Sequence, residues 1–167
     1  IKIMWNSERK IKTKEEISEI ANNLRKENKI IVFTNGCFEI LHPGHITLLE
    51  KAKSLGDILI VGINSDESVK KIKGEKKLIF DEKSRLKIIS SLECVDYTVL
   101  FDEETPENII RTIKPHIHVK GGDYKEEDLP EAKIVKSYGG KVVIVPLLEG
   151  FSTTQIINRI LTLYKDH

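Results

Sequence analysis

The chain has 167 residues, and 27 Lys and Arg residues against 26 Asp and Glu residues give it a formal net charge of +1. This length suits a single domain with a full-sized core, and 40% apolar with 32% charged residues is typical of a globular protein. The balanced charge argues against a general nucleic-acid binder. No apolar run approaches the roughly 20 residues of a membrane span, and the first residues lack a signal peptide's apolar core, so we expect a cytoplasmic protein.

Helices and strands are predicted to alternate along the chain. Residues 13–27 open with a capping box, Thr13-x-x-Glu16, and then carry apolar residues at helical spacing. Residues 29–34 are a β-branched run, typical of a strand buried on both faces. The further predicted strands are 57–64, 97–101, 117–120 and 141–147. The further predicted helices are 44–55, 81–92, one from 105 that ends before 115, 130–138 and one that begins at 152. Residues 70–77, "KKIKGEKK", are expected to form an irregular basic loop.

This alternation predicts an α/β fold of the doubly wound, Rossmann-like type, with a parallel sheet of about five strands and helices on both faces. We expect one domain over 1–167, with the helix 13–27 leading into it. In such sheets, ligands bind beyond the carboxyl ends of the strands, where the strand order reverses. Three unusual segments directly follow predicted strands, and we take them as the candidate site: "NGCFEILHPGH" (35–45), "GGDY" (121–124) and "LEGFSTT" (148–154).

The sharpest of these patterns is the pair His42 and His45 at the start of a predicted helix. Their spacing of three places both imidazoles on one side of the first turn, where unpaired backbone N–H groups already favour an anion. Gly44 lets a phosphate approach the backbone. Two ring N–H donors there can stabilise charge on a phosphoryl group. The alternatives are structural histidines or a metal-binding pair, although zinc would need a third protein ligand and none is obvious.

The other two segments carry further candidates for binding phosphate. Residues 152–154, Ser-Thr-Thr, occupy the cap and first turn of a helix, and we interpret them as a second phosphate-binding turn; the alternative is an ordinary helix cap. Lys120 can reach a phosphate, while the following glycines allow a base or ribose to lie against the backbone; the alternative is a surface lysine.

Basic residues elsewhere add a third group of candidates. Arg85 lies on an otherwise apolar helix face, and a salt bridge at the rim is the alternative to a phosphate contact. Lys73 and Lys77 belong to the basic run, which is either a solvated loop or a flap that closes on polyphosphate. Cys37 is expected to be a packing residue beside the histidine loop.

Taken together, "NGCFEILHPGH" and "GFSTT" resemble the HxGH nucleotidyltransferase superfamily. More narrowly, "LGDILIVGINSDESV", "CVDYTVLFDEETPENII" and "VKGGDY" resemble the D-glycero-D-manno-heptose 1-phosphate adenylyltransferases, in order from about residue 10 to residue 160. Glu39 stands where that pattern usually has Asp. The chain is then either a stand-alone transferase or a domain of a kinase fusion.

The resemblance implies a role for each candidate. His42, His45 and Lys120 are the expected catalytic residues, with both histidines on the reacting α-phosphate, and Lys73 and Lys77 are the expected flap contacts to substrate phosphate. The expected nucleotide-binding residues are Asn35, Gly36, Cys37, Phe38, Gly44, Arg85, Gly122, Asp123, Ser152, Thr153 and Thr154. No metal site made of protein side chains is expected.

The implied reaction moves AMP from ATP to D-glycero-β-D-manno-heptose 1-phosphate and releases pyrophosphate, a step of ADP-heptose and lipopolysaccharide biosynthesis. The attacking phosphate is already anionic and needs no general base, and Mg²⁺ is expected to be carried mainly by the nucleotide phosphates. The alternatives are a cytidylyltransferase of the glycerol-3-phosphate type and a non-catalytic nucleotide-binding module. The expected partners are ATP and a sugar 1-phosphate, without nucleic acid or membrane, and a homodimer is left open.

Overall fold

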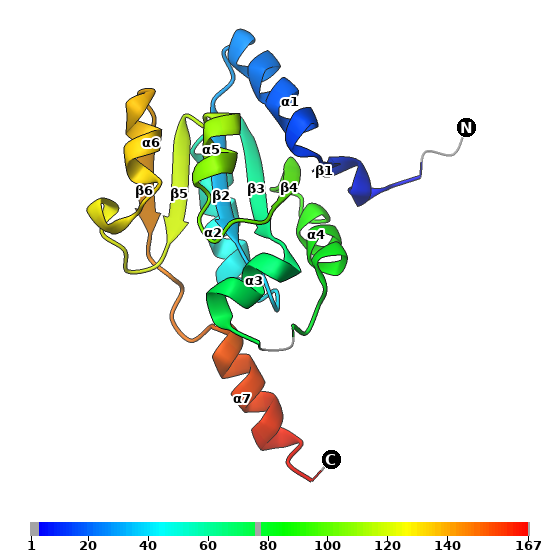
Figure 1. The fold of residues 1–167 in the computed structure, drawn as a ribbon. Coiled ribbons are helices and arrows are strands. Elements are labelled where there is room, and N and C mark those ends of the chain that lie inside the picture. Colours follow the sequence, from blue (N-terminus) through cyan, green and yellow to red (C-terminus); the bar gives the residue numbers. More distant parts are fainter. Residues whose placement is uncertain (1–3, 76–77, 167) are drawn as a thin grey trace.

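The computed structural model describes residues 4–75 and 78–166, and within them the strands form a single parallel sheet (Figure 1). The strands are β1 (Ile11–Lys12), β2 (Ile31–Gly36), β3 (Ile58–Asn64), β4 (Tyr97–Phe101), β5 (Ile117–Gly121) and β6 (Lys141–Val145). Their spatial order is β1-β4-β3-β2-β5-β6, and each neighbouring pair is parallel. The predicted parallel α/β sheet is confirmed.

Strand β1 is an addition to the five strands that the sequence predicts. It consists of two residues, Ile11 and Lys12, which pair with Thr98 and Val99 at the edge of the sheet. Two residues are too few to show a period of two, so this strand exists only because β4 offers it an open edge.

The described residues contain seven α-helices, and none of them is long and apolar enough to cross a bilayer. They are α1 (Lys14–Lys26), α2 (Pro43–Ser54), α3 (Asp66–Lys73), α4 (Glu82–Ser90), α5 (Glu107–Ile113), α6 (Ala132–Ser137) and α7 (Thr153–Leu163). Two short 3-10 turns are η1 (Ser7–Lys10) and η2 (Glu126–Asp128).

Helix α3 corrects the expectation that residues 70–77 are irregular. Ser65 caps this helix by accepting a hydrogen bond from the Ser68 N–H at 3.1 Å, and Asp66 and Glu67 place negative charge in its first turn. Val69 is buried beneath it. Residues 70–73 therefore form the last turn of a capped helix, where positive charge complements the helix dipole, while Gly74 and Glu75 are irregular as predicted; residues 76 and 77 lie outside the described ranges.

Two apolar clusters cover the two faces of the sheet, which confirms the predicted helices on both sides. Helices α2 and α4 pack on one face, where the cluster includes Val32, Leu49, Ala52, Leu59, Val61, Leu86 and Ile89. Helices α1, α5 and α6 pack on the other, where the cluster includes Ile17, Ala21, Phe33, Ile60, Ile109, Ile110 and Val135. Neighbouring residues of β3 face opposite clusters, as the strand pleat requires.

The strand order reverses between β2 and β5. The chain proceeds from β2 outward through β3 to β4 and then returns to form β5 on the other side of β2. The side-chain hydroxyl of Thr34 on β2 donates a hydrogen bond to the Val119 carbonyl on β5 at 2.8 Å, which joins the two strands close to their carboxyl ends. The histidine loop leaves β2 at this point, and α7 follows β6 and projects from the same end of the sheet (Figure 1).

Candidate active site

The two histidines of the loop after β2 stack on each other at the start of α2. Their ring centroids lie 3.7 Å apart with an angle of 25° between the ring planes. Nδ1 of His42 accepts a hydrogen bond from the Gly44 N–H at 3.1 Å, and Nδ1 of His45 accepts one from the His42 N–H at 3.3 Å. A ring nitrogen that accepts carries no proton, so each neutral ring holds its proton on Nε2. Each histidine thus keeps one N–H donor free of the helix backbone.

Burial keeps both imidazoles neutral. It lowers the pKa of His42 below its ordinary value. The pKa of His45 is lowered from 6.5 to about 4, mainly by burial and to a smaller extent by the nearby His42 and Lys73. The two rings therefore act near neutral pH as uncharged hydrogen-bond donors rather than as cations.

The residues between the histidines make this stacking possible. Pro43 occupies the first turn of α2, where no backbone donor is needed. A Cβ atom at Gly44 would lie 2.9 Å from Cε1 of His42 and 3.4 Å from Cβ of Phe151. Glycine is therefore required so that the His42 ring can fold over the start of the helix.

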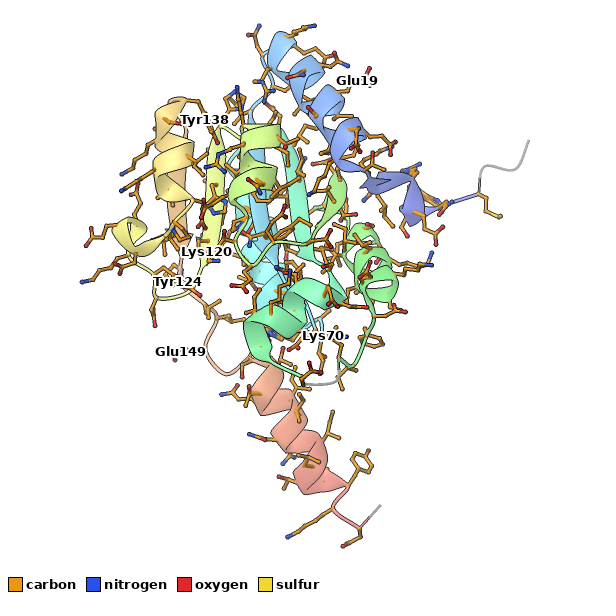
Figure 2. The ribbon with its side chains drawn as sticks, in the orientation of Figure 1. Glu19, Lys70, Lys120, Tyr124, Tyr138 and Glu149 are labelled. Carbon is orange, nitrogen blue, oxygen red and sulfur yellow. The ribbon has the colours of Figure 1, made fainter. Side chains whose placement is uncertain are left out.

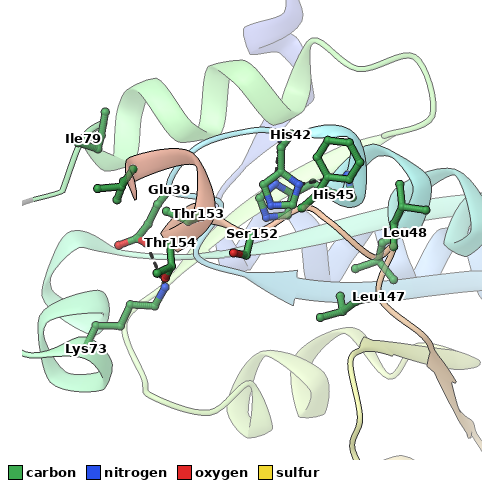
Figure 3. Close-up of a pocket in the computed structure, with 14 residues that line it drawn as sticks. Glu39, His42, His45, Leu48, Lys73, Ile79, Leu147, Ser152, Thr153 and Thr154 are labelled. Atoms are coloured by element: carbon green, nitrogen blue, oxygen red, sulfur yellow. Dashed lines mark hydrogen bonds and ion pairs between the residues drawn. The ribbon is translucent and has the colours of Figure 1, made fainter. Parts of the chain in front are cut away.

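The histidine pair lines a pocket of about 380 Å³, shown in Figure 3. Seven of the residues predicted from the sequence meet there: His42, Gly44, His45, Lys73, Ser152, Thr153 and Thr154. They come from the start of α2, the end of α3 and the start of α7, which are far apart in the sequence.

The Ser-Thr-Thr segment forms the first turn of α7. Ser152 caps the helix, and its side chain accepts a hydrogen bond from the Gln155 N–H at 3.1 Å. The turn is thus a helix cap and a wall of the pocket at once. Free N–H groups at a helix start favour an anion, so the turn and the histidines present donors to the same space.

Lys73 and Glu39 form an ion pair in the pocket wall, with 3.1 Å between Nζ and Oε2 (Figure 3). The Glu39 side chain is 15% exposed and that of Lys73 is 40% exposed. The ammonium group of Lys73 is therefore held at the pocket by a carboxylate. Lys77, the other predicted flap contact, lies outside the described residues.

The end of β2 lies beneath the histidines rather than in the pocket wall. Phe38 is buried with a positive φ of 51°, and its ring centroid lies 5.3 Å from that of His45. A Cβ at Gly36 would lie 3.0 Å from the Phe38 ring.

Cys37 is half-buried, which raises its thiol pKa, as expected for a packing residue. The buried Asn35 Oδ1 has no hydrogen-bond partner among the described residues. Asn35, Gly36, Cys37 and Phe38 thus support the histidine loop from below.

Arg85 does not line the pocket, and it forms the salt bridge of the alternative interpretation in the interior rather than at the rim. It is 1% exposed. Its guanidinium donates to the carbonyls of Phe80, Cys37 and Asn64 and pairs with the Asp66 carboxylate at 2.7 Å. The apolar face of α4 packs on the sheet and carries the arginine inward with it. The side chain joins the histidine loop to the end of β3 and the start of α3.

The segment after β5 adjoins the pocket without lining it. The ammonium group of Lys120 lies 5.1 Å from the centre of the Tyr124 ring, at the end of the sheet where Figure 2 also shows Glu149. Gly122 has a φ of +126°, which suits glycine alone, and Asp123 is exposed. A Cβ at Gly121 would lie 2.8 Å from Leu48, itself a pocket residue. Lys120, Gly122 and Asp123 are therefore next to pocket residues without lining the pocket themselves.

The pocket also has an apolar wall, to whose residues the sequence analysis assigned no role. It consists of Leu48, Ile79, Leu147, Leu148, Phe151 and Ile157. The Phe151 ring is nearly parallel to that of His42, with centroids 6.2 Å apart. The available signal was the placement of Leu147, Leu148 and Phe151 directly after a strand and before the capping serine.

The described residues contain no cluster of three or more His, Cys, Asp or Glu side chains able to hold a metal ion. Among those that line the pocket, Glu39 supplies the carboxylate, and it is already paired with Lys73. A hard cation that arrives with its own phosphate oxygens and water fits this donor set.

Paired imidazole donors beside a helix start, beyond the switch point of a parallel sheet, are suited to hold a phosphate group of a bound ligand. The cytidylyltransferase-like family matches residues 33–159, and the chain belongs to this family of HxGH nucleotidyltransferases. The match contains the histidine loop and the first turn of α7.

Similar proteins agree with this family. The chain is 48% identical over 159 residues to the bifunctional protein HldE of Geobacter metallireducens, and 50% identical over 155 residues to that of Aliarcobacter butzleri. These matches cover 95% and 93% of this chain but 32% of each relative, so the chain spans about a third of their length.

Two solved structures share the fold. A lipopolysaccharide core biosynthesis protein from Thermoplasma volcanium is 36% identical with a TM-score of 0.58, over 72% of this chain and 97% of that one. A pantoate-beta-alanine ligase from Francisella tularensis has a TM-score of 0.60 at 19% identity, over 93% of this chain and 78% of that one. At that identity the second likeness concerns the fold alone.

Proposed function

We propose that the chain transfers AMP from ATP to D-glycero-β-D-manno-heptose 1-phosphate, giving ADP-heptose and pyrophosphate. The observation that carries the proposal is the stacked pair His42 and His45, whose Nδ1 atoms are engaged by the backbone and whose Nε2–H groups remain for a phosphate. The segments that resemble the heptose 1-phosphate adenylyltransferases and the likeness to HldE support the choice of sugar.

In this reaction an oxygen of the sugar phosphate attacks the α-phosphorus of ATP. The new P–O bond forms as the bond from the α-phosphorus to the bridging oxygen breaks, and pyrophosphate leaves with that electron pair. The Nε2–H groups of His42 and His45 stabilise the charge that develops on the α-phosphate oxygens. The attacking oxygen carries no proton, so the reaction needs no general base. The neutral histidines therefore act only as hydrogen-bond donors.

The departing phosphates are assigned to the first turn of α7. Ser152, Thr153 and Thr154 offer hydroxyls and backbone N–H groups there, and Lys73 offers an ammonium group in the same pocket. A Mg²⁺ ion would supply neutralisation of the negative charge on these phosphates, and Glu39 is the pocket carboxylate that would face its water shell. Lys120 is assigned to a phosphate of the nucleotide from the neighbouring end of β5.

The test is an assay of pyrophosphate release with ATP, Mg²⁺ and a panel of sugar 1-phosphates. We expect turnover with the heptose 1-phosphate and none with hexose 1-phosphates. A variant that lacks both imidazoles, His42→Ala with His45→Ala, is the matched control for contaminating activity. Binding of ATP without pyrophosphate release from any acceptor would contradict the proposal and favour a non-catalytic nucleotide-binding module.

A second candidate is a cytidylyltransferase of the glycerol-3-phosphate type, which the cytidylyltransferase-like family match favours. The two candidates differ in the base that they bind. Thermal-shift measurements with ATP and with CTP distinguish them, since the preferred nucleotide raises the melting temperature at a lower concentration. We expect the larger shift with ATP.

A further inference from the structure

Lys120, near the carboxyl end of β5, forms no ion pair with any residue that the structure describes. Its ammonium group lies instead over the ring of Tyr124, with 5.1 Å between Nζ and the ring centre (Figure 2). The face of an aromatic ring attracts a cation electrostatically, although the ring carries no net charge. The tyrosine therefore holds the ammonium group without neutralising it.

Lys73, the other lysine that we assign to a phosphate, is held in a different way. Its Nζ lies 3.1 Å from Oε2 of Glu39, a carboxylate that is 15% exposed. A carboxylate at this distance cancels part of the charge that an approaching phosphate would meet, whereas an aromatic ring does not. Of the two lysines, Lys120 thus keeps more of its charge available to an incoming anion.

The Tyr124 ring reaches Lys120 because the chain turns back on itself at Gly122. This glycine has a φ of +126°, and its N–H donates a hydrogen bond to the Val145 carbonyl at the end of β6 at 3.0 Å. A Cβ atom at Gly122 would lie 3.0 Å from the Tyr124 ring, so the ring packs on bare backbone. The turn is therefore anchored to the sheet, and it fixes where the ring lies.

Lys120 is close to the pocket and to the histidine loop. A Cβ atom on the next residue, Gly121, would lie 2.8 Å from Leu48 and 3.4 Å from Leu147, which both line the pocket. Burial raises the pKa of the Cys37 thiol in the histidine loop, and Lys120 is among the cations that oppose this rise. The positive charge of Lys120 therefore acts on the loop that carries the two histidines.

We propose that Tyr124 is a positioning residue, which holds the ammonium group of Lys120 in place for a phosphate of the bound nucleotide. This inference rests on the proposed function, from which it takes ATP as the nucleotide. A lysine that is free in solvent loses rotamer freedom when it binds a phosphate. Because the ring restricts Lys120 beforehand, less freedom is lost on binding, and the whole charge remains for the phosphate.

The test compares two replacements of Tyr124 by the Kd for ATP with Mg²⁺, measured by isothermal titration calorimetry. Tyr124→Leu keeps an apolar side chain but removes the aromatic ring, and we expect it to weaken ATP binding about fivefold. Tyr124→Phe keeps the ring face, and we expect a Kd within about twofold of that of the unmodified chain. Thermal melting followed by circular dichroism checks that both variants remain folded.

A Lys120→Met background shows whether Tyr124 acts through the lysine. In that background we expect Tyr124→Leu to have no further effect on the Kd, because the ammonium group that the ring positions is absent. A purely structural residue would weaken binding equally in both backgrounds, and that result would overturn the proposal. Equal binding by Tyr124→Leu and the unmodified chain would also overturn it, as would an equal loss of affinity in Tyr124→Phe and Tyr124→Leu.

A measurement without ligand separates this proposal from the reaction. Methylene protons above an aromatic ring resonate upfield, so NMR should show upfield Lys120 signals in the unmodified chain and in Tyr124→Phe, but not in Tyr124→Leu. Absence of this shift from the unmodified chain would overturn the proposal. If ATP binds with the expected pattern among the variants but no acceptor yields pyrophosphate, the proposed AMP transfer alone is contradicted.

Discussion

The two imidazoles of the candidate site are oriented by the backbone of their own helix. The backbone N–H of Gly44 fixes the ring of His42, and the N–H of His42 fixes the ring of His45. This arrangement sets the tautomer of both rings before any ligand arrives. The spacing of three matters for His45, since its ring accepts a hydrogen bond from the backbone N–H of His42 at the other end of the same turn.

At this scale we expect His42→Ala or His45→Ala to lower kcat by about 100- to 1,000-fold while ATP binding survives. Loss of one donor to a developing charge typically costs about 2.7–4 kcal/mol in the transition state. The measurements are steady-state pyrophosphate release and the Kd for ATP. His116→Gln is a suitable control, because His116 lies at the amino end of β5, where it accepts from the Ile31 N–H. Near-normal turnover in both alanine variants would contradict the assignment.

The lowered pKa of His45 predicts how stability depends on pH. The native ring takes up its proton only near pH 4, whereas the unfolded chain takes one up near 6.5. Between these values the unfolded state binds more protons, so the free energy of unfolding falls as the pH is lowered from 6.5 towards 4. Urea denaturation at pH 7 and at pH 4.5 measures this loss, and His45→Gln should reduce it. An identical pH dependence in the variant would argue against a neutral buried ring.

Among the elements, α4 connects the pocket loop to the rest of the fold. Its Arg85 donates to carbonyls of three separate segments, at Cys37, Asn64 and Phe80, and its ion pair reaches Asp66 at the start of α3. A buried arginine with four of its five N–H donors directed at specific acceptors holds these segments in one geometry. The histidine loop therefore owes its position to a helix that lies more than 40 residues further along the chain.

We expect Arg85→Lys to lower the free energy of unfolding by about 3 kcal/mol, because breaking a buried ionic network leaves its acceptors without donors. Urea denaturation followed by circular dichroism measures the change. Lys87→Ala on the same helix is the matched control: its ion pair with Glu8 is exposed, so the loss should stay below about 1 kcal/mol. Equal effects of the two substitutions would show that the network contributes little.

For the molecule as a whole, stability is divided between the two faces of the sheet. Ile60 and Ile63 lie on the same strand and are both fully buried, but they belong to opposite clusters. Because neither shares its apolar neighbours with the other, each face should behave as a separate part of one core.

We expect Ile60→Ala and Ile63→Ala each to cost about 2–5 kcal/mol, and the double variant to cost about the sum of the two. Chemical denaturation of the three variants measures these changes. If one substitution proves almost neutral, that face of the sheet contributes little to the core. If the double variant departs strongly from the sum, the two faces are coupled through the strand.

Several features of this protein could be predicted from the sequence because their signals are local. The β-branched runs, the capping box at Thr13, the helix cap at Ser152 and the histidines at the start of a helix each depend on residues within a few positions of one another. The order of strands and helices, and hence the parallel sheet, follows from those signals. So does the end of the sheet at which His42 and Ser152 lie, because the carboxyl ends of parallel strands share one edge.

Other features depended on contacts between distant segments. The edge strand β1 exists because β4 is open beside it, and α3 extends into the lysine run as far as Lys73, with Val69 buried on its inner side. Arg85 is inside the protein because its acceptors come from three other segments, and Lys73 faces Glu39 across 34 positions of chain. A single sequence carries no periodic signal for such pairs, so only the tertiary structure decided them.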